Sequence, residues 1–104
     1  MSELPPKFCL VLLSPPSIVE KLVDLLLASV GDEVFTSAPT FSHGTAHGRL
    51  SATEQVMGRS AAVQVQILLT EPALHALLQR LRNEFCGTGL RYWASPLALE
   101  GEVR

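Results

Sequence analysis

A long polar segment, from about residue 42 to 60, separates two apolar halves of this 104-residue chain. It joins two stretches with the pattern of β-strands and is too long for a simple hairpin turn. It contains two His, two Arg, three Gly and a Glu-Gln pair. Long loops in compact domains are usually functional or disordered, so functional residues are expected here and scaffold is expected elsewhere.

The first half reads as a strand, a helix and a strand. Residues 8–13 form a continuous apolar run, which predicts a strand buried on both faces. The Ser-Pro-Pro-Ser sequence that follows predicts a helix capped by Ser14 or Ser17 and ended by a left-handed Gly31. Residues 33–41 predict a second strand with an irregular end. The helix has one apolar stripe, which consists of Ile18, Leu22, Leu25 and Leu26.

The second half repeats this order. Residues 61–69 alternate apolar and polar side chains, which predicts a strand, and Thr70 is expected to cap the helix that follows. Residues 90–94 predict a last strand, in which Tyr92 and Trp93 alternate, one toward the core and the other toward an interface. Within the polar segment, residues 52–57 have the spacing of a short helical piece. The second helix has the apolar stripe Leu74, Leu77, Leu78, Leu81 and Phe85.

The order of elements predicts a single α+β domain over residues 1–104 with the ferredoxin-like βαββαβ arrangement. In this fold two helices cover one face of a four-stranded antiparallel sheet and leave the other face open. Because the first strand is apolar on both faces, we expect a symmetric homo-oligomer to cover the open face. In the tail after the last strand, Pro96, Leu97 and Leu99 are apolar side chains that can pack on a neighbour.

Composition and charge exclude several classes of function. Hydrophobic residues make up 47% of the chain and charged residues 17%, which also favours oligomerisation. A net charge of −2 offers no basic field for nucleic acid. The start of the chain lacks the pattern of a secretory signal, and the apolar run at 22–30 is too short to span a membrane, so a cytoplasmic protein with no membrane insertion is expected. Cys9 and Cys86 are expected to be reduced there, with Cys9 in the core.

Several motifs along the chain are those of a known family: Ser42-His43-Gly44, Leu50-Ser51, Glu54-Gln55-Val56, Gly58-Arg59, Val63-Gln64-Val65-Gln66 and Leu90-Arg91-Tyr92-Trp93. Over nearly its whole length the chain resembles small bacterial proteins of uncharacterised function in the PII-like superfamily, which are associated with heavy-metal efflux systems. The resemblance implies a homotrimer that binds a small effector at clefts between subunits. It also implies a partner in an efflux system or another regulatory protein.

The chain departs from nucleotide-binding PII proteins at two points. Their turn between the second helix and the next strand is rich in Gly and Lys and holds phosphates, whereas the matching Gly87-Thr88-Gly89 has no lysine. Many of them carry a tyrosine in the long loop, whereas the only tyrosine here is Tyr92. Modification of a loop tyrosine is therefore not expected.

His43 and His47 are the candidate metal ligands. They lie four apart in a loop punctuated by glycine, and neutral imidazole is the commonest protein ligand for zinc, copper and nickel. Cys86 or Glu54 of a neighbouring subunit is a possible further ligand. The alternative is that these histidines bond only backbone or water.

Three arginines are the candidate anion ligands, because a guanidinium holds phosphate or carboxylate with two parallel bonds. They would act with the backbone amides of the Gly87–Gly89 turn. The alternative is salt bridges at the surface or between subunits, and Gly44 can serve only as a turn residue. The predicted effector site comprises His43, Gly44, Arg49, Arg59, Gly87, Thr88, Gly89 and Arg91.

No catalytic set stands out in the sequence, so an enzyme is not expected. The sequence predicts a PII-like sensor whose effector is a transition metal ion or an adenine nucleotide. One alternative is a protein-interaction adaptor with no small-molecule ligand. The other is an acylphosphatase-like enzyme, which would share the fold.

Overall fold

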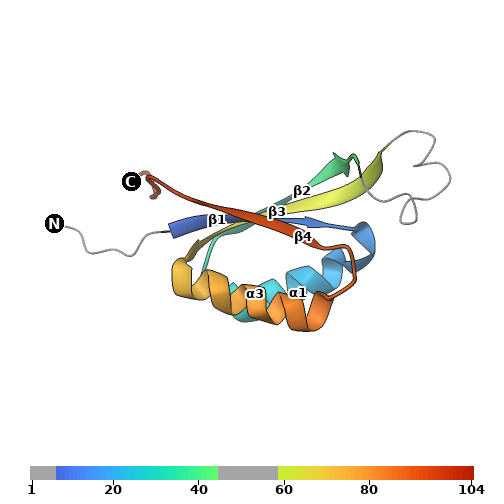
Figure 1. The fold of residues 1–104 in the computed structure, drawn as a ribbon. Helices are drawn as coiled ribbons and strands as arrows, with labels where there is room; N and C mark the ends of the chain where they lie inside the picture. The colour runs from blue at the N-terminus through green and yellow to red at the C-terminus, as the bar shows by residue number, and fades with distance from the viewer. Residues whose placement is uncertain (1–6, 45–58) are drawn as a thin grey trace.

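The computed structural model describes residues 7–44 and 59–104, which form a four-stranded antiparallel sheet with two helices on one face (Figure 1). This is the predicted ferredoxin-like arrangement, and the fold prediction is confirmed. The elements in chain order are β1 (Lys7–Ser14), the 3-10 turn η1 (Pro16–Ile18), α1 (Val19–Val30), β2 (Phe35–Ser42), β3 (Ser60–Thr70), α3 (Glu71–Phe85) and β4 (Arg91–Pro96).

The strand order is β2-β3-β1-β4, so β1 lies inside the sheet. It pairs with β3 on one side, with Leu10 opposite Ile67, and with β4 on the other, with Leu10 opposite Ala94. β2 pairs with β3 at the far edge, where Phe35 lies opposite Ile67. Strands β2 and β4 therefore lie at opposite edges of the sheet.

The core lies between the sheet and the helices. Leu10 and Leu12 of β1 are fully buried against it, together with Val65, Ile67 and Leu69 of β3. The predicted stripes of both helices are confirmed, because their leucines form this core. Its helical members are Leu22, Leu25, Leu26, Leu74, Leu77, Leu78, Leu81 and Phe85.

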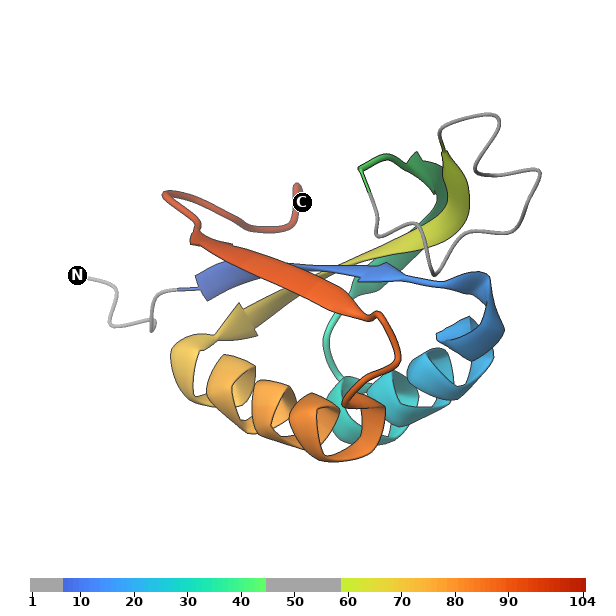
Figure 2. The same cartoon turned by 45° about the vertical axis from the view of Figure 1, so that its right-hand side comes forward.

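The opposite side of the sheet carries the alternate side chains, because successive residues of a strand point to opposite faces. We call this side the open face, and its apolar members are Cys9, Val11, Leu13, Leu68 and Trp93. In the part of the chain that the structure describes, both helices lie on the other face, and the tail after β4 turns back on the open side (Figure 2). Neither described helix covers the open face, although Val11 in its middle is only 9% exposed.

Two predicted helix ends are wrong. Ser17 does not cap α1: the cap residue is Ile18, with no side-chain hydrogen bond, because η1 inserts a tight turn in which the Ile18 amide donates to the Pro15 carbonyl. The Ser14 hydroxyl donates instead to that carbonyl, at 2.9 Å. Gly31 has a right-handed φ of −62°, because the chain leaves α1 through a bond from the Glu33 amide to the Val30 carbonyl.

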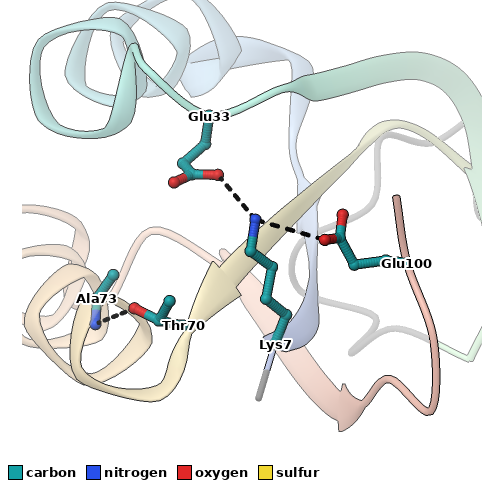
Figure 3. Close-up of polar contacts among 5 residues, drawn as sticks. All are labelled: Lys7, Glu33, Thr70, Ala73 and Glu100. Carbon is teal, nitrogen blue, oxygen red and sulfur yellow. Dashed lines mark hydrogen bonds and ion pairs between the residues drawn. The ribbon is translucent and has the colours of Figure 1, made fainter. Parts of the chain in front are cut away.

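The predicted cap of the second helix is confirmed. The Ala73 amide donates to Thr70 Oγ1 at 3.4 Å (Figure 3). Thr70 is the last residue of β3, so one residue ends the strand and begins α3. This direct junction holds α3 against the sheet.

An ion-pair cluster joins three segments at the end of the sheet where β1 begins. Lys7 Nζ lies 3.7 Å from Oε2 of Glu33, in the turn after α1, and 3.7 Å from Oε2 of Glu100, in the tail (Figure 3). The Leu97 amide also donates to the Lys7 carbonyl at 2.9 Å. Lys7 therefore fixes the start of the tail beside β1.

The two cysteines lie at different places in the fold. Cys9 and Cys86 are both free, and Cys86 is exposed just after α3. The prediction that Cys9 lies in the core is wrong, because its register opposite Leu68 and Ser95 places it, partly buried, on the open face. Neither α1 nor α3, the helices of the described residues, is long and apolar enough to cross a bilayer.

Candidate functional site

The candidate residues lie at one end of the sheet. β2 ends there, β3 and β4 begin there, and β1 leads there into η1 (Figure 1). His43, Gly44 and Arg59 flank the connection from β2 to β3, whereas Gly87 and Arg91 flank the start of β4. The predicted site is therefore split into two groups.

These two groups do not meet within one chain. Three strand spacings of roughly 4.8 Å each, or about 14 Å, separate β2 from β4 across the sheet. One subunit thus presents half of the predicted effector site at each edge. The first half, which we call the β2 half-site, consists of His43, Gly44 and Arg59, and the second, the β4 half-site, consists of Gly87, Thr88, Gly89 and Arg91.

In the β2 half-site, Arg59 is held by an aromatic ring. Its guanidinium carbon lies 4.1 Å from the centroid of Phe41, which is the distance of a cation–π contact. His43 is exposed directly after β2, and Gly44 has a φ of 75°, as the predicted left-handed turn requires. The ring of Phe41 thus orients the arginine at the point where the polar segment returns to the sheet.

In the β4 half-site, the turn is shaped by Thr88 between two glycines. Gly87 and Gly89 have φ values of 78° and 92°, which an L side chain adopts only under strain. The Thr88 hydroxyl donates to the Phe85 carbonyl at 2.7 Å and accepts from the Leu90 amide at 3.4 Å. Thr88, which the sequence proposed as an effector ligand, therefore has a structural role within the turn.

Two groups of the β4 half-site remain for an anion. The Gly89 amide makes no hydrogen bond to any residue of 7–44 or 59–104, and Arg91 forms no ion pair with them. Arg59 also lacks a carboxylate partner in these ranges. Guanidinium groups without carboxylate partners, beside a backbone amide, are typical of sites for phosphate.

Some predicted residues lie outside the described residues, namely His47, Arg49 and the helical turns at 52–57. Among the residues that are described, no three His, Cys, Asp or Glu side chains gather as a group that could hold a metal ion. The metal site at His43 and His47 stays a prediction.

The structure adds an apolar groove that the sequence did not reveal. It has a volume of about 320 Å³ and lies between the end of α3, the turn and β4. At its rim the Arg82 guanidinium donates to the Tyr92 hydroxyl at 3.4 Å. In the sequence, the one signal that could have indicated this groove is the alternation of Tyr92 and Trp93, because Tyr92 lies on the helix side of the sheet. The lining residues are Leu12, Leu78, Leu81, Arg82, Phe85, Cys86, Gly87, Gly89, Leu90 and Tyr92.

Solved structures share this fold. The crystal structure of a DUF3240 family protein from Shewanella baltica OS155 aligns over 100% of both chains, with 20% identity and a TM-score of 0.76. The PII-like protein CPII from Thiomonas intermedia K12, bound to ADP, AMP and bicarbonate, aligns over 94% of this chain and 97% of its own, with 16% identity and a TM-score of 0.72.

A third similar structure is that of a putative PII-like signalling protein from Thermus thermophilus. It aligns over 89% of this chain and 88% of its own, with 17% identity and a TM-score of 0.62. The fold is therefore that of PII-like proteins.

At the level of sequence, no curated protein matches the chain. A family model, described as a protein of unknown function (DUF3240), matches residues 4–104. That match spans both half-sites as well as the core, and the chain belongs to the DUF3240 family.

Proposed function

We propose that this protein is a cytoplasmic PII-like regulator that binds an adenine nucleotide at clefts between the subunits of a homotrimer, and that it is not an enzyme. The observation that carries the proposal is the division of the candidate site. The two half-sites lie at the same end of the sheet but at opposite edges, so a second subunit is needed to complete the site.

A ring of subunits would join the half-sites. When the β2 edge of one subunit faces the β4 edge of the next, Arg59 of the first approaches Gly89 and Arg91 of the second. A rotation that closes on itself repeats this contact at every interface. The apolar open face supports self-association as well, because Trp93 and Leu13 are part of a surface that a second copy would cover.

The chemistry of the half-sites favours a phosphate ligand. Arg59, Arg91 and the Gly89 amide are all donors, and nucleotide phosphates accept hydrogen bonds from such groups. CPII, which shares the fold, is bound to ADP and AMP. Without a lysine in the turn, the guanidinium groups would supply the positive charge here.

The other functions predicted from the sequence have less support. A transition-metal effector depends on His43 and His47, and the link with heavy-metal efflux rests on family resemblance alone. For an enzyme, the carboxylates of α3 offer little: Glu71 and Glu84 are exposed and lie beside His75 and Arg80 of the same helix. An adaptor without a small-molecule ligand is the remaining alternative.

Native mass spectrometry of the metal-free protein with ADP, AMP and ATP tests the proposal. We expect a trimer that takes up three nucleotides. Arg59→Ala and Arg91→Ala should each weaken binding by about tenfold or more, since a hydrogen bond to a charged group contributes roughly 1.5–3 kcal/mol. Arg80→Ala is the matched control, because Arg80 already pairs with Glu84 of α3 and donates to Ser29 of α1, and it should leave binding unchanged.

Other outcomes would point to the alternatives. A trimer that binds zinc or copper but no nucleotide, and loses the metal on His43→Ala, would replace the nucleotide with a metal effector. A trimer that binds neither would favour the adaptor. Release of phosphate from a phosphorylated substrate, lost on Arg59→Ala, would contradict the proposal of a non-enzyme.

A further inference from the structure

Helix α1 carries a second apolar stripe beside the one that forms the core. Val19, Val23, Leu27 and Val30 fall on one flank of a helix that has about 3.6 residues per turn. Val30 packs against the core, whereas Val19 and Val23 are only partly buried outside the core cluster and Leu27 is 58% exposed. α1 is therefore apolar over more of its circumference than the core uses. We call these four residues the α1 flank.

The α1 flank lies on the side of the helix that faces away from α3. The opposite side of α1 contacts α3, because Lys21 Nζ lies 5.8 Å from the centroid of the Phe85 ring and the Arg80 guanidinium donates to Ser29 Oγ at 2.6 Å. The two helices lie side by side under the sheet (Figure 2). In residues 7–44 and 59–104, no further α-helix lies beyond α1 to cover its free flank.

Two carboxylates beside the α1 flank lack cationic partners. Glu20 and Asp24 lie four apart on the outer surface of α1, and neither forms an ion pair with any described residue. Like charges at this spacing destabilise a helix. Lys21, the one basic residue of α1, lies over the Phe85 ring instead. The border of the flank therefore favours an occupant that brings positive charge.

Helix α3 has neither feature. Its carboxylates are paired within the helix, since Glu71 lies 3.6 Å from His75 and Glu84 lies 3.1 Å from Arg80. The large apolar side chains of α3 are all members of the core, so its outer surface has no apolar stripe. The apolar flank with unpaired carboxylates is thus specific to α1.

We propose that the α1 flank binds a basic amphipathic helix of another protein. Leu27 would pack between the apolar side chains of that helix, and Glu20 and Asp24 would pair with its lysines or arginines. An apolar stripe along one helix accepts the ridge of a second helix, and complementary charge at the border selects the partner. The 12 residues of α1 match a partner helix of about three turns, or roughly 16 Å.

The inference goes beyond the proposed function. The α1 flank includes no residue of either half-site, and its contact with a partner does not require a nucleotide. It identifies a surface through which a regulator can reach a second protein, and it gives that protein a chemical description.

Two synthetic peptides test the proposal. Both have about 14 residues, or roughly four helical turns, with leucines at helical spacing. The first has lysines at the remaining positions, and the second has glutamates there. Added to the isotope-labelled full chain, the lysine peptide should shift the amide resonances of residues 19–30 and spare those on the outer surface of α3. The glutamate peptide should shift neither set.

Variants of the α1 flank measure its contribution to affinity. Leu27→Asn, and the Glu20→Gln, Asp24→Asn double variant, should each weaken binding of the lysine peptide by about tenfold. The Glu71→Gln, Glu84→Gln double variant is the matched control, because it removes the same charge from α3, and it should leave the affinity unchanged. Leu27, Glu20 and Asp24 are exposed, so urea unfolding of these variants should differ little from that of the parent chain.

Three outcomes would overturn the proposal. The first is equal weakening by the two double variants, which would mean that the peptide responds only to net charge. The second is a set of resonance shifts confined to the sheet or to α3. The third is a lower subunit count for Leu27→Asn, which would mean that a second copy covers the flank. The proposed function has a separate readout, namely the nucleotides bound by the trimer and their loss on Arg59→Ala.

Discussion

The two faces of the sheet differ in how much of their surface the described parts of one chain cover. On the helix face, Leu10 and Leu12 are fully buried because α1 and α3 lie over them. On the open face, neither of the described helices lies over the alternate residues of the sheet; Val11 of β1 is 9% exposed, but Trp93 opposite it on β4 is 48% exposed. One strand therefore serves both an internal core and a surface with apolar character.

This difference separates stability from function. The helix face is a core, whose side chains a chain needs in order to fold at all. The open face, the tail and the groove carry apolar area that the described parts of one chain leave accessible. Substitutions on the helix face should consequently lower the free energy of unfolding, whereas substitutions on the open face should weaken self-association.

The largest effect on unfolding is expected on the helix face. Leu26→Ala should lower the free energy of unfolding by about 2–5 kcal/mol, because Leu26 is fully buried and its truncation leaves a cavity. Leu27→Ala is the matched control, since the neighbouring Leu27 is 58% exposed, and it should cost well under about 1 kcal/mol. Urea unfolding of both variants at one protein concentration measures the difference. Equal losses would contradict the assignment of the core.

A smaller effect, and on association, is expected on the open face. Trp93→Ala should weaken self-association by about 30-fold, which corresponds to roughly 2 kcal/mol, because large aromatic side chains often dominate interfaces. Val34→Ala, in the turn after α1, is an exposed control that should have no such effect. Sedimentation across a range of concentrations reports the change. Unaltered association in Trp93→Ala would remove the open face from the interface.

The smallest effect is expected at the ion pairs of the tail. Glu100→Gln should reduce the free energy of unfolding by less than about 1 kcal/mol, because Lys7 and Glu100 are both partly exposed. It should nevertheless speed hydrogen exchange at the Leu97 amide, which bonds to the Lys7 carbonyl. Glu84→Gln, on α3, is the control for a simple loss of charge. Exchange at Leu97 that is the same in both variants would show that Lys7 does not hold the tail.

Most of the fold was predictable because its signals are periodic. The alternation at 61–69 and the leucine stripes of both helices depend only on which face is buried, and the structure follows them. Helix ends were less predictable. Pro15 and Pro16 favour a 3-10 turn that displaces the cap from Ser17 to Ile18, and Gly31 is tolerant enough to stay right-handed.

The sequence offers candidate site residues but not their arrangement, and their role in binding stays a prediction. Guanidinium chemistry makes Arg59 and Arg91 candidate anion ligands, yet only the strand order shows that they lie at opposite edges. Likewise, Tyr92 was expected either in the core or at an interface, and it lines a groove at 48% exposure. Periodicity assigns a face but not the distance between β4 and α3, so the groove was not foreseen.

The central place of β1 has a consequence for synthesis. As the chain leaves the ribosome, β1 emerges first, but Lys7 pairs with Thr70, and Leu10 pairs with both Ile67 and Ala94. Neither of the strands that pair with β1 exists until synthesis has reached β3 and then β4, so the apolar side chains of β1 stay unpaired until then. Pairing between residues so far apart in the sequence slows folding, and until it occurs an apolar strand is exposed and prone to aggregate. The nascent chain is thus expected to need protection from aggregation until β3 and β4 have emerged.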